Sequence, residues 1–129
     1  MLKKISAMVI LSLAVGLSAC STRQIAQSPT VALSPQIQDQ AITTSIQTSI
    51  QSLSKRDWRV ESVTPDRVVA GLDYRGHYLQ VTYFIEQHRV RSEITASQNF
   101  SQHGSQIHRK ALKFKAGLDR RVFQKLAKL

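Results

Sequence analysis

The sequence predicts an α+β domain in which a four-stranded antiparallel meander is covered on one face by an N-terminal and a C-terminal helix, as a two-layer sandwich. Two patterns support this prediction. Apolar residues recur every three or four positions before residue 54 and after residue 106, which is helical spacing. Between residues 58 and 96 they alternate with polar residues, which is strand spacing. At 129 residues, the chain has room for one domain.

The first twenty residues predict a secretory signal peptide. Lys3 and Lys4 precede the uncharged run 5–19, whose 15 residues fall short of the roughly 20 that a membrane-spanning helix needs. Cys20 follows at once and is the only cysteine in the chain, so no internal disulfide can form.

The residues before Cys20 resemble the lipobox of bacterial lipoproteins, and they are Leu17, Ser18 and Ala19. The resemblance implies that the thiol receives a diacylglycerol, that residues 1–19 are removed, and that the new amino group is acylated. Three acyl chains, palmitate among them, would then hold the protein to a membrane, and about two already give stable anchoring. The alternative is an ordinary signal peptide followed by an unmodified cysteine.

The lipobox divides the chain into three parts. Residues 1–19 are the signal peptide, residues 20–34 are the lipidated cysteine and a flexible tether, and residues 35–129 are the folded domain. The alternative for the tether is an ordered strand around residues 30–33. Asp directly after the cysteine resembles an inner-membrane retention signal in Gram-negative lipoproteins, and this chain has Ser21 there. We therefore expect the inner leaflet of the outer membrane, facing the periplasm.

The first helix is predicted to begin with Ser34 as its N-cap and Pro35 at its first position, and to end near residues 55–56. The rest of its surface is polar and nearly uncharged. Its single apolar stripe consists of Ile42, Ile46, Ile50 and Leu53.

Four strands should follow, because the period changes to two at Trp58. Turns are predicted at 64–66, 75–76 and 87–88. The polar residues on one side of each strand are typical of an antiparallel sheet that is covered on the other side.

Helical spacing returns at Ile107 and continues to the last residue. Gly117 lies inside this helix and leaves open whether it bends or breaks there. The predicted apolar stripe contains Ala111, Phe114, Leu118, Val122 and Leu126.

Positive charge is concentrated on that last helix. The whole chain has a net charge of +10, and removal of Lys3 and Lys4 with the signal peptide leaves +8. Residues 107–129 contain eight Lys and Arg against the single acid Asp119, so they account for +7. We expect contact with phospholipid headgroups, lipopolysaccharide phosphates or an acidic envelope protein. The alternative is a solvated helix face. The candidate contact residues are Arg109, Lys110, Lys113, Arg120, Arg121 and Lys128.

Catalytic motifs are absent from the sequence, which has no Gly-x-Ser-x-Gly, no phosphate-binding loop and no His-Glu-x-x-His. The acids are scattered, and His103 and His108 have no third ligand nearby, so we expect no metal, no cofactor and no enzymatic activity. A basic helix would also attract nucleic acid, but an exported lipoprotein does not meet it, so no nucleic-acid partner is expected.

Three short motifs follow one another along the chain, and they are Asp57-Trp58-Arg59-Val60, Arg75-Gly76-His77 and Ser97-Gln98-Asn99-Phe100. Their order and spacing resemble a family of small bacterial lipoproteins without an assigned function. The resemblance covers residues 36–126 and implies location and fold but no activity. The departures are Asp57 where the family has Gly, and Ala111, Leu112 and Phe114 where it has Tyr-Asn-x-Trp. The matching motifs contain a candidate polar patch of Arg75, His77, Ser97 and Asn99.

The sequence thus predicts a non-enzymatic, lipid-anchored envelope protein that binds or braces another envelope component. One alternative is a periplasmic inhibitor or adaptor of a single envelope protein, which would need an exposed apolar or sheet-edge patch. Another is a small envelope hydrolase, which would need acids and histidines in one pocket.

Overall fold

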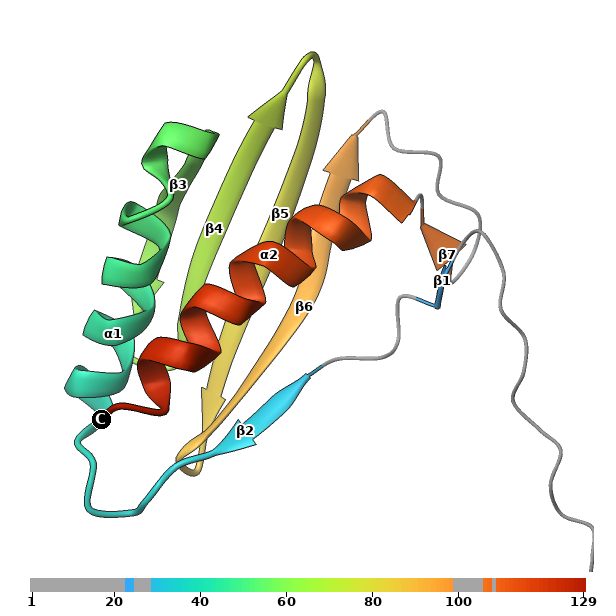
Figure 1. Ribbon diagram of the computed structural model, residues 1–129. Coiled ribbons are helices and arrows are strands. Elements are labelled where there is room, and N and C mark those ends of the chain that lie inside the picture. The colour runs from blue at the N-terminus through green and yellow to red at the C-terminus, as the bar shows by residue number, and fades with distance from the viewer. Residues whose placement is uncertain (1–22, 25–28, 99–105, 108) are drawn as a thin grey trace, which may run out of the picture.

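The computed structural model describes residues 23–24, 29–98, 106–107 and 109–129 (Figure 1). It confirms the α+β class, with two α-helices and a five-stranded antiparallel sheet where four strands were predicted. The elements in chain order are β1 (Arg23–Gln24), β2 (Thr30–Ala32), α1 (Asp39–Gln51), the short 3-10 helix η2 (Ser54–Arg56), β3 (Trp58–Thr64), β4 (Arg67–Tyr74), β5 (His77–Glu86), β6 (Arg89–Gln98), β7 (Gln106–Ile107) and α2 (Arg109–Leu126).

The main sheet has the strand order β2-β6-β5-β4-β3, with every pair of neighbours antiparallel. The strands β3 to β6 form the predicted meander. The extra strand β2 lies in the segment predicted as a flexible tether, and it agrees with the alternative of an ordered strand around residues 30–33. It forms because β6 would otherwise be an open edge, and the partly buried Val31 and Leu33 pack against the core.

A second, two-stranded ribbon pairs β1 with β7 beside the start of α2. Arg23 lies opposite Ile107, and Gln24 lies opposite Gln106. Cys20 and the predicted lipobox residues before it lie outside the described residues.

The helix α1 begins at Asp39, four residues after the proline that was predicted as its first position. Ser34 instead caps a turn, because its Oγ accepts a hydrogen bond from Gln36 N (3.3 Å) and its carbonyl accepts one from Ile37 N (3.1 Å). After η2, Asp57 adopts a left-handed conformation (φ 71°) that turns the chain into β3. The sequence left open whether the last helix breaks at Gly117, and α2 is continuous through that residue.

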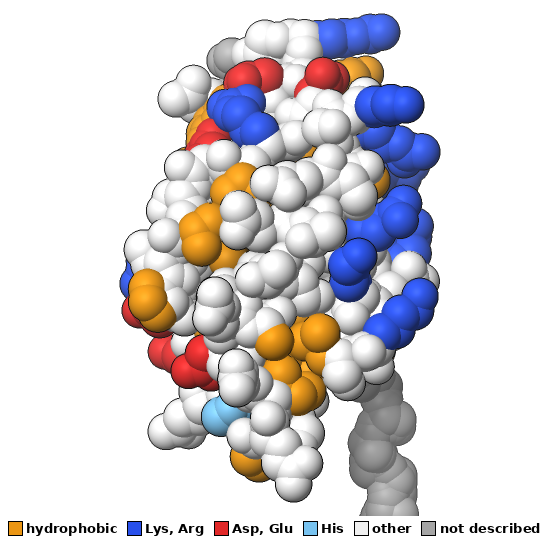
Figure 2. Space-filling model, turned by 90° about the vertical axis from the view of Figure 1, so that its left-hand side faces the viewer, with side chains coloured by type: hydrophobic (Ala, Val, Ile, Leu, Met, Phe, Trp, Pro, Cys, Tyr) orange, Lys and Arg blue, Asp and Glu red, His pale blue; other side chains and the backbone are white. Residues whose placement is uncertain are grey.

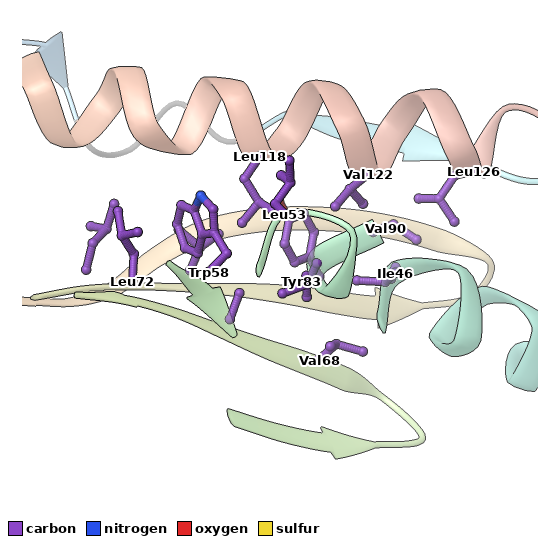
Figure 3. Close-up of a cluster of buried hydrophobic side chains, with 14 of the residues drawn as sticks. Ile46, Leu53, Trp58, Val68, Leu72, Tyr83, Val90, Leu118, Val122 and Leu126 are labelled. Atoms are coloured by element: carbon purple, nitrogen blue, oxygen red, sulfur yellow. The ribbon is translucent and has the colours of Figure 1, made fainter. Parts of the chain in front are cut away.

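Both helices lie on the same face of the sheet and share one hydrophobic core with it (Figures 1 and 3). All four residues of the predicted α1 stripe are buried. Figure 3 shows Leu118, Val122 and Leu126 pointing from α2 towards Tyr83 and Val90 of the sheet. The core therefore fixes α2 alongside α1, and this arrangement defines the groove described next.

Candidate functional site

A buried polar cluster fixes which side of α2 faces the sheet. Lys115 Nζ lies 2.7 Å from Asp119 Oδ2, and the two side chains are only 8% and 9% exposed. The carboxylate of Asp119 also accepts hydrogen bonds from the Tyr83 hydroxyl (2.6 Å) and Ser92 Oγ (3.1 Å). Burial, with the adjacent Asp119 carboxylate, raises the pKa of Tyr83 well above its usual value of about 10. Asp119, the only acid of α2, is therefore buried in an ion pair with Lys115 and does not lie on the surface of the helix.

The remaining seven cations of this helical segment are all exposed, and no exposed acid accompanies them between residues 109 and 129. Figure 2, viewed from the side of α1, shows Lys and Arg side chains gathered in a column along the flank where α2 lies. Within the described residues, no acidic group lies within ion-pairing distance of Lys113, Arg120, Arg121, Lys125 or Lys128.

Two adjoining grooves run between α1 and α2 and share Arg121 and Gln124. The first, which we name the Ser45 groove, lies between the start of α1 and the end of α2 and has a volume of about 870 Å³. The second, the Trp58 groove, lies at the other end of α1 and has a volume of about 640 Å³. Neither groove is lined by an acid or a histidine. Together they are lined by seven cations, which are Lys55, Arg56, Lys113, Arg120, Arg121, Lys125 and Lys128.

Such a set of cations, without acids between them, creates a positive potential along the groove. This potential attracts anions, and a bound anion reduces the repulsion between the cations. In the Ser45 groove the cations come from α2, whereas α1 supplies the exposed, uncharged hydroxyl groups of Thr44 and Thr48. The arrangement can therefore combine charge with hydrogen bonds from neutral donors around one ligand.

Ser45 is the unusual member of this wall. The residue is 5% exposed, and its Oγ has no hydrogen-bond partner among the described residues. Neighbouring hydroxyls on α1 do have one, because Thr43 Oγ1 donates to Gln40 O (3.0 Å) and Ser49 Oγ donates to Ser45 O (2.8 Å). A buried hydroxyl without a partner is costly and rare in proteins.

Four of the predicted contact residues line these grooves, namely Lys113, Arg120, Arg121 and Lys128. The other two lie at the start of α2. Arg109 is exposed there, and Lys110 Nζ lies 5.1 Å from the centre of the Tyr74 ring. Lys125 was counted among the cations of the last helix but not among the contact residues. Sequence reasoning missed Ser45 and the basic pair Lys55 and Arg56 of η2, which lines the Trp58 groove together with residues of α2.

The predicted polar patch lies elsewhere, at the end of the sheet near the β4–β5 turn. His77 pairs with Tyr74, and Ser97 pairs with Leu79, so both lie near that end. The guanidinium of Arg75 stacks on the Tyr74 ring, with its central carbon 5.3 Å from the ring centre. Asn99, His103 and His108 lie outside the described residues.

The outer face of the sheet carries a separate polar network that sequence reasoning also missed. The carboxylate of Glu61 accepts hydrogen bonds from the Tyr78 hydroxyl (2.7 Å) and Gln80 Nε2 (3.2 Å). Arg59 pairs with both Glu61 (2.8 Å) and Asp73 (2.6 Å). Cations and acids are therefore paired on this face of the sheet. They are not paired in this way on the opposite side of the molecule, where α1 and α2 form the surface that we call the helical face.

No protein-family model, curated protein or solved structure matches this chain. None of the described helices is sufficiently long and apolar to cross a bilayer. The described residues also contain no cluster of three or more His, Cys, Asp or Glu side chains able to hold a metal ion. What the fold and the site define is a small α+β domain with a cationic helical face.

Proposed function

We propose that this protein is a lipid-anchored lipoprotein of the bacterial envelope, held in the inner leaflet of the outer membrane and facing the periplasm. It acts as a non-enzymatic binding module, and its helical face lies against an anionic membrane surface. The observation that carries this proposal is the one-sided charge, with seven exposed cations and no exposed acid between residues 109 and 129.

The size of this charge effect is sufficient for membrane contact. A Lys or Arg close to an anionic leaflet contributes about 1 kcal/mol, and the attraction fades over a Debye length of about 8 Å at physiological salt. Several such residues on one face, among them Lys113, Arg120 and Arg121, give an attraction of several kcal/mol. This contact would orient the domain, while the acyl chains would keep it at the membrane.

The pairing of β1 with β7 supports the same orientation. Arg23 is three residues after Cys20, and its pairing partner Ile107 is two residues before Arg109. Three extended residues span at most about 10 Å. An acyl group on Cys20 would therefore enter the membrane close to the start of α2, the first part of the cationic face.

The adaptor alternative has less support. The large hydrophobic side chains exposed in the described residues are Val63 and Leu129, which is little for an apolar docking patch. The open edge strand β3 has a bulge between Val60 and Ser62, a feature that discourages the addition of another strand.

Vesicle co-sedimentation tests the proposal. A chain of residues 20–129 with Cys20→Ser lacks the acyl chains and keeps every residue of the described core. We expect it to sediment with anionic vesicles, to ignore neutral vesicles, and to dissociate at about 1 M salt, where the Debye length is about 3 Å. Binding to neutral vesicles, or binding that salt does not weaken, would show that charge is not the cause.

A further inference from the structure

We infer that the Trp58 groove binds a long-chain carboxylate, whose hydrocarbon chain lies on the apolar floor of the groove and whose head group accepts a hydrogen bond from Trp58. The inference goes beyond the proposed function, because it gives the helical face a ligand site that can be tested in the absence of a membrane. Three observations carry it, which are a buried donor without an acceptor, a space left open at Gly117, and an apolar floor beneath a rim of cations.

The indole N–H of Trp58 is a hydrogen-bond donor that the fold leaves without an acceptor. The residue is 5% exposed, so its ring is almost completely buried. Its main-chain N–H donates to Leu53 O (3.4 Å), but the side-chain Nε1 donates to none of the described residues. A buried tryptophan usually has a partner for this group. The missing acceptor therefore needs an explanation.

The same nitrogen is open to the groove. Among the buried and half-buried residues that the structure describes, the one side-chain nitrogen or oxygen that lacks both a partner and contact with solvent is Ser45 Oγ, so Nε1 of Trp58 keeps accessible surface. Trp58 lines the groove, and Figure 3 shows its nitrogen on the edge of the ring that faces α2. A ligand seated in the groove can therefore accept the hydrogen bond that the protein itself does not.

Gly117 leaves a space in the wall of this groove. It lies in the interior of α2, where glycine costs about 1 kcal/mol relative to alanine. A β-carbon at this position would meet no neighbouring atom within 4 Å, so no close approach of another described segment requires the missing side chain. The residue lines the groove beside Phe114 and Leu118. Glycine therefore keeps the groove open at the expense of helix stability, as a ligand site requires.

The floor of the groove is apolar, and its rim is positively charged. Leu53 and Trp58 are buried and Phe114 is half-buried, so their side chains form the floor. Exposed cations alone would attract any anion, whereas an apolar floor adds affinity only for an anion that carries hydrocarbon. A carboxylate can accept the indole N–H and also pair with a guanidinium. No acid or histidine lines the groove, and the cations of its rim are Lys55, Arg56, Lys113, Arg120 and Arg121.

The dimensions of the groove suit one acyl chain. Its volume of about 640 Å³ is within the range of small-molecule sites. The residues of α2 that line it run from Lys113 to Gln124, and at about 1.5 Å per residue this stretch of helix is roughly 16 Å long. A single hydrocarbon chain of medium length can lie along it. A short carboxylate, in contrast, would leave most of the apolar floor uncovered.

The test uses Trp58 as its own reporter, because it is the only tryptophan in the chain and gives a single indole N–H signal in an NMR spectrum. Residues 20–129 with Cys20→Ser are titrated with dodecanoate below its micelle concentration. Butyrate supplies the carboxylate without the chain, and dodecyl maltoside supplies the chain without the charge. The variant Gly117→Leu places a side chain in the groove. Its matched control is Ala116→Leu, at an exposed neighbouring position that does not line the groove.

We expect dodecanoate to shift the indole signal saturably and to bind at least about tenfold more tightly than butyrate or dodecyl maltoside, since it alone satisfies both floor and rim. Gly117→Leu should abolish this shift without lowering the thermal unfolding temperature, because leucine favours a helix more than glycine does. Ala116→Leu should bind like the parent chain. Trp58→Phe keeps an aromatic ring but loses the donor, and calorimetry should show dodecanoate binding weakened about tenfold.

Several results would overturn the inference. They are the absence of a saturable shift with dodecanoate, equal affinity for butyrate or for dodecyl maltoside, and binding that survives Gly117→Leu. Tighter binding of the peptide Leu-Leu-Phe, which has a free terminal carboxylate, would also overturn it in favour of a protein partner. Failure of the proposed function looks different. A chain that binds anionic vesicles but not dodecanoate keeps the membrane-contact proposal, whereas one that binds dodecanoate and ignores vesicles supports the groove and overturns the membrane contact.

Discussion

Lys115 Nζ lies 2.7 Å from Asp119 Oδ2, one turn apart on α2, and both groups are buried against the sheet. Since this pair is neutral overall and faces inward, all the charged side chains on the exposed side of α2 are cations. In the sequence, the same pair has the spacing of an ordinary surface salt bridge on a helix. Its burial turns a basic helix with one balancing acid into a helix whose exposed charge has a single sign.

Removing one member of this pair should be strongly destabilising. We expect Lys115→Met to lower the free energy of unfolding by about 3–5 kcal/mol, because the carboxylate of Asp119 stays buried without its cation. The double variant Lys115→Met with Asp119→Leu should recover only part of this loss, since apolar groups can replace the buried pair but leave the hydroxyls of Tyr83 and Ser92 without a partner. Urea unfolding measures both. Lys113→Met, on the exposed face, is the control and should change stability by less than about 0.5 kcal/mol. Equal effects at positions 113 and 115 would contradict the buried pair.

Tyr83 should make the fold sensitive to alkaline pH. Its pKa is raised in the folded protein by burial and by Asp119, so the neutral phenol is favoured in the folded state. The resulting stabilisation is fully present below about pH 10, the pKa of an unfolded tyrosine, and is lost as the pH rises above it. Denaturant unfolding between pH 8 and about pH 11 should show this decline.

Tyr83→Phe separates this effect from general alkaline unfolding. The variant should start about 1–3 kcal/mol less stable, because Asp119 loses a hydrogen bond, but its stability should fall less steeply with pH. Tyr74→Phe, at a half-buried tyrosine, is the matched control and should keep the parent slope. A Tyr83→Phe slope equal to that of the parent would rule out this residue as the cause.

Gly71 is needed because the side chain of Glu61 lies directly over it. A β-carbon at position 71 would overlap the carboxylate of Glu61, which would have to leave its bonds to Tyr78 and Gln80. We expect Gly71→Ala to cost about 1 kcal/mol in the parent chain. In a Glu61→Ala background the same change should become neutral or stabilising, since alanine suits a strand better than glycine. Unfolding of the four proteins gives the coupling, and additive effects would contradict the contact.

The sequence predicted the parts of the fold that have a strong period. The stripe from Ile42 to Leu53 and the alternation from Trp58 onwards correspond to α1, η2 and the strands β3 to β6. The strand β2 has three residues and no period of its own. It depends on pairing with β6, about sixty residues later, so local patterns did not favour it over a tether.

The site was only half predictable for a related reason. A charge count locates the cations of α2, but it does not show that Asp119 and Lys115 turn inward. Ser45 belongs to a run of Ser, Thr and Gln that has the pattern of a solvent-facing surface. Its burial and its place in the groove depend on α1 packing against α2, which is a tertiary contact.

The most direct test of the central claim is whether anionic membranes recognise the helical face in preference to the sheet face. Arg120→Gln with Arg121→Gln removes two arginines from the helical face, and Arg67→Gln with Arg89→Gln removes two from the sheet face. In the 20–129 chain with Cys20→Ser, we expect the first pair to weaken binding to anionic vesicles by about 2 kcal/mol, or about 30-fold, and the second pair to leave it nearly unchanged. Equal weakening by the two pairs would contradict an oriented contact through the helical face.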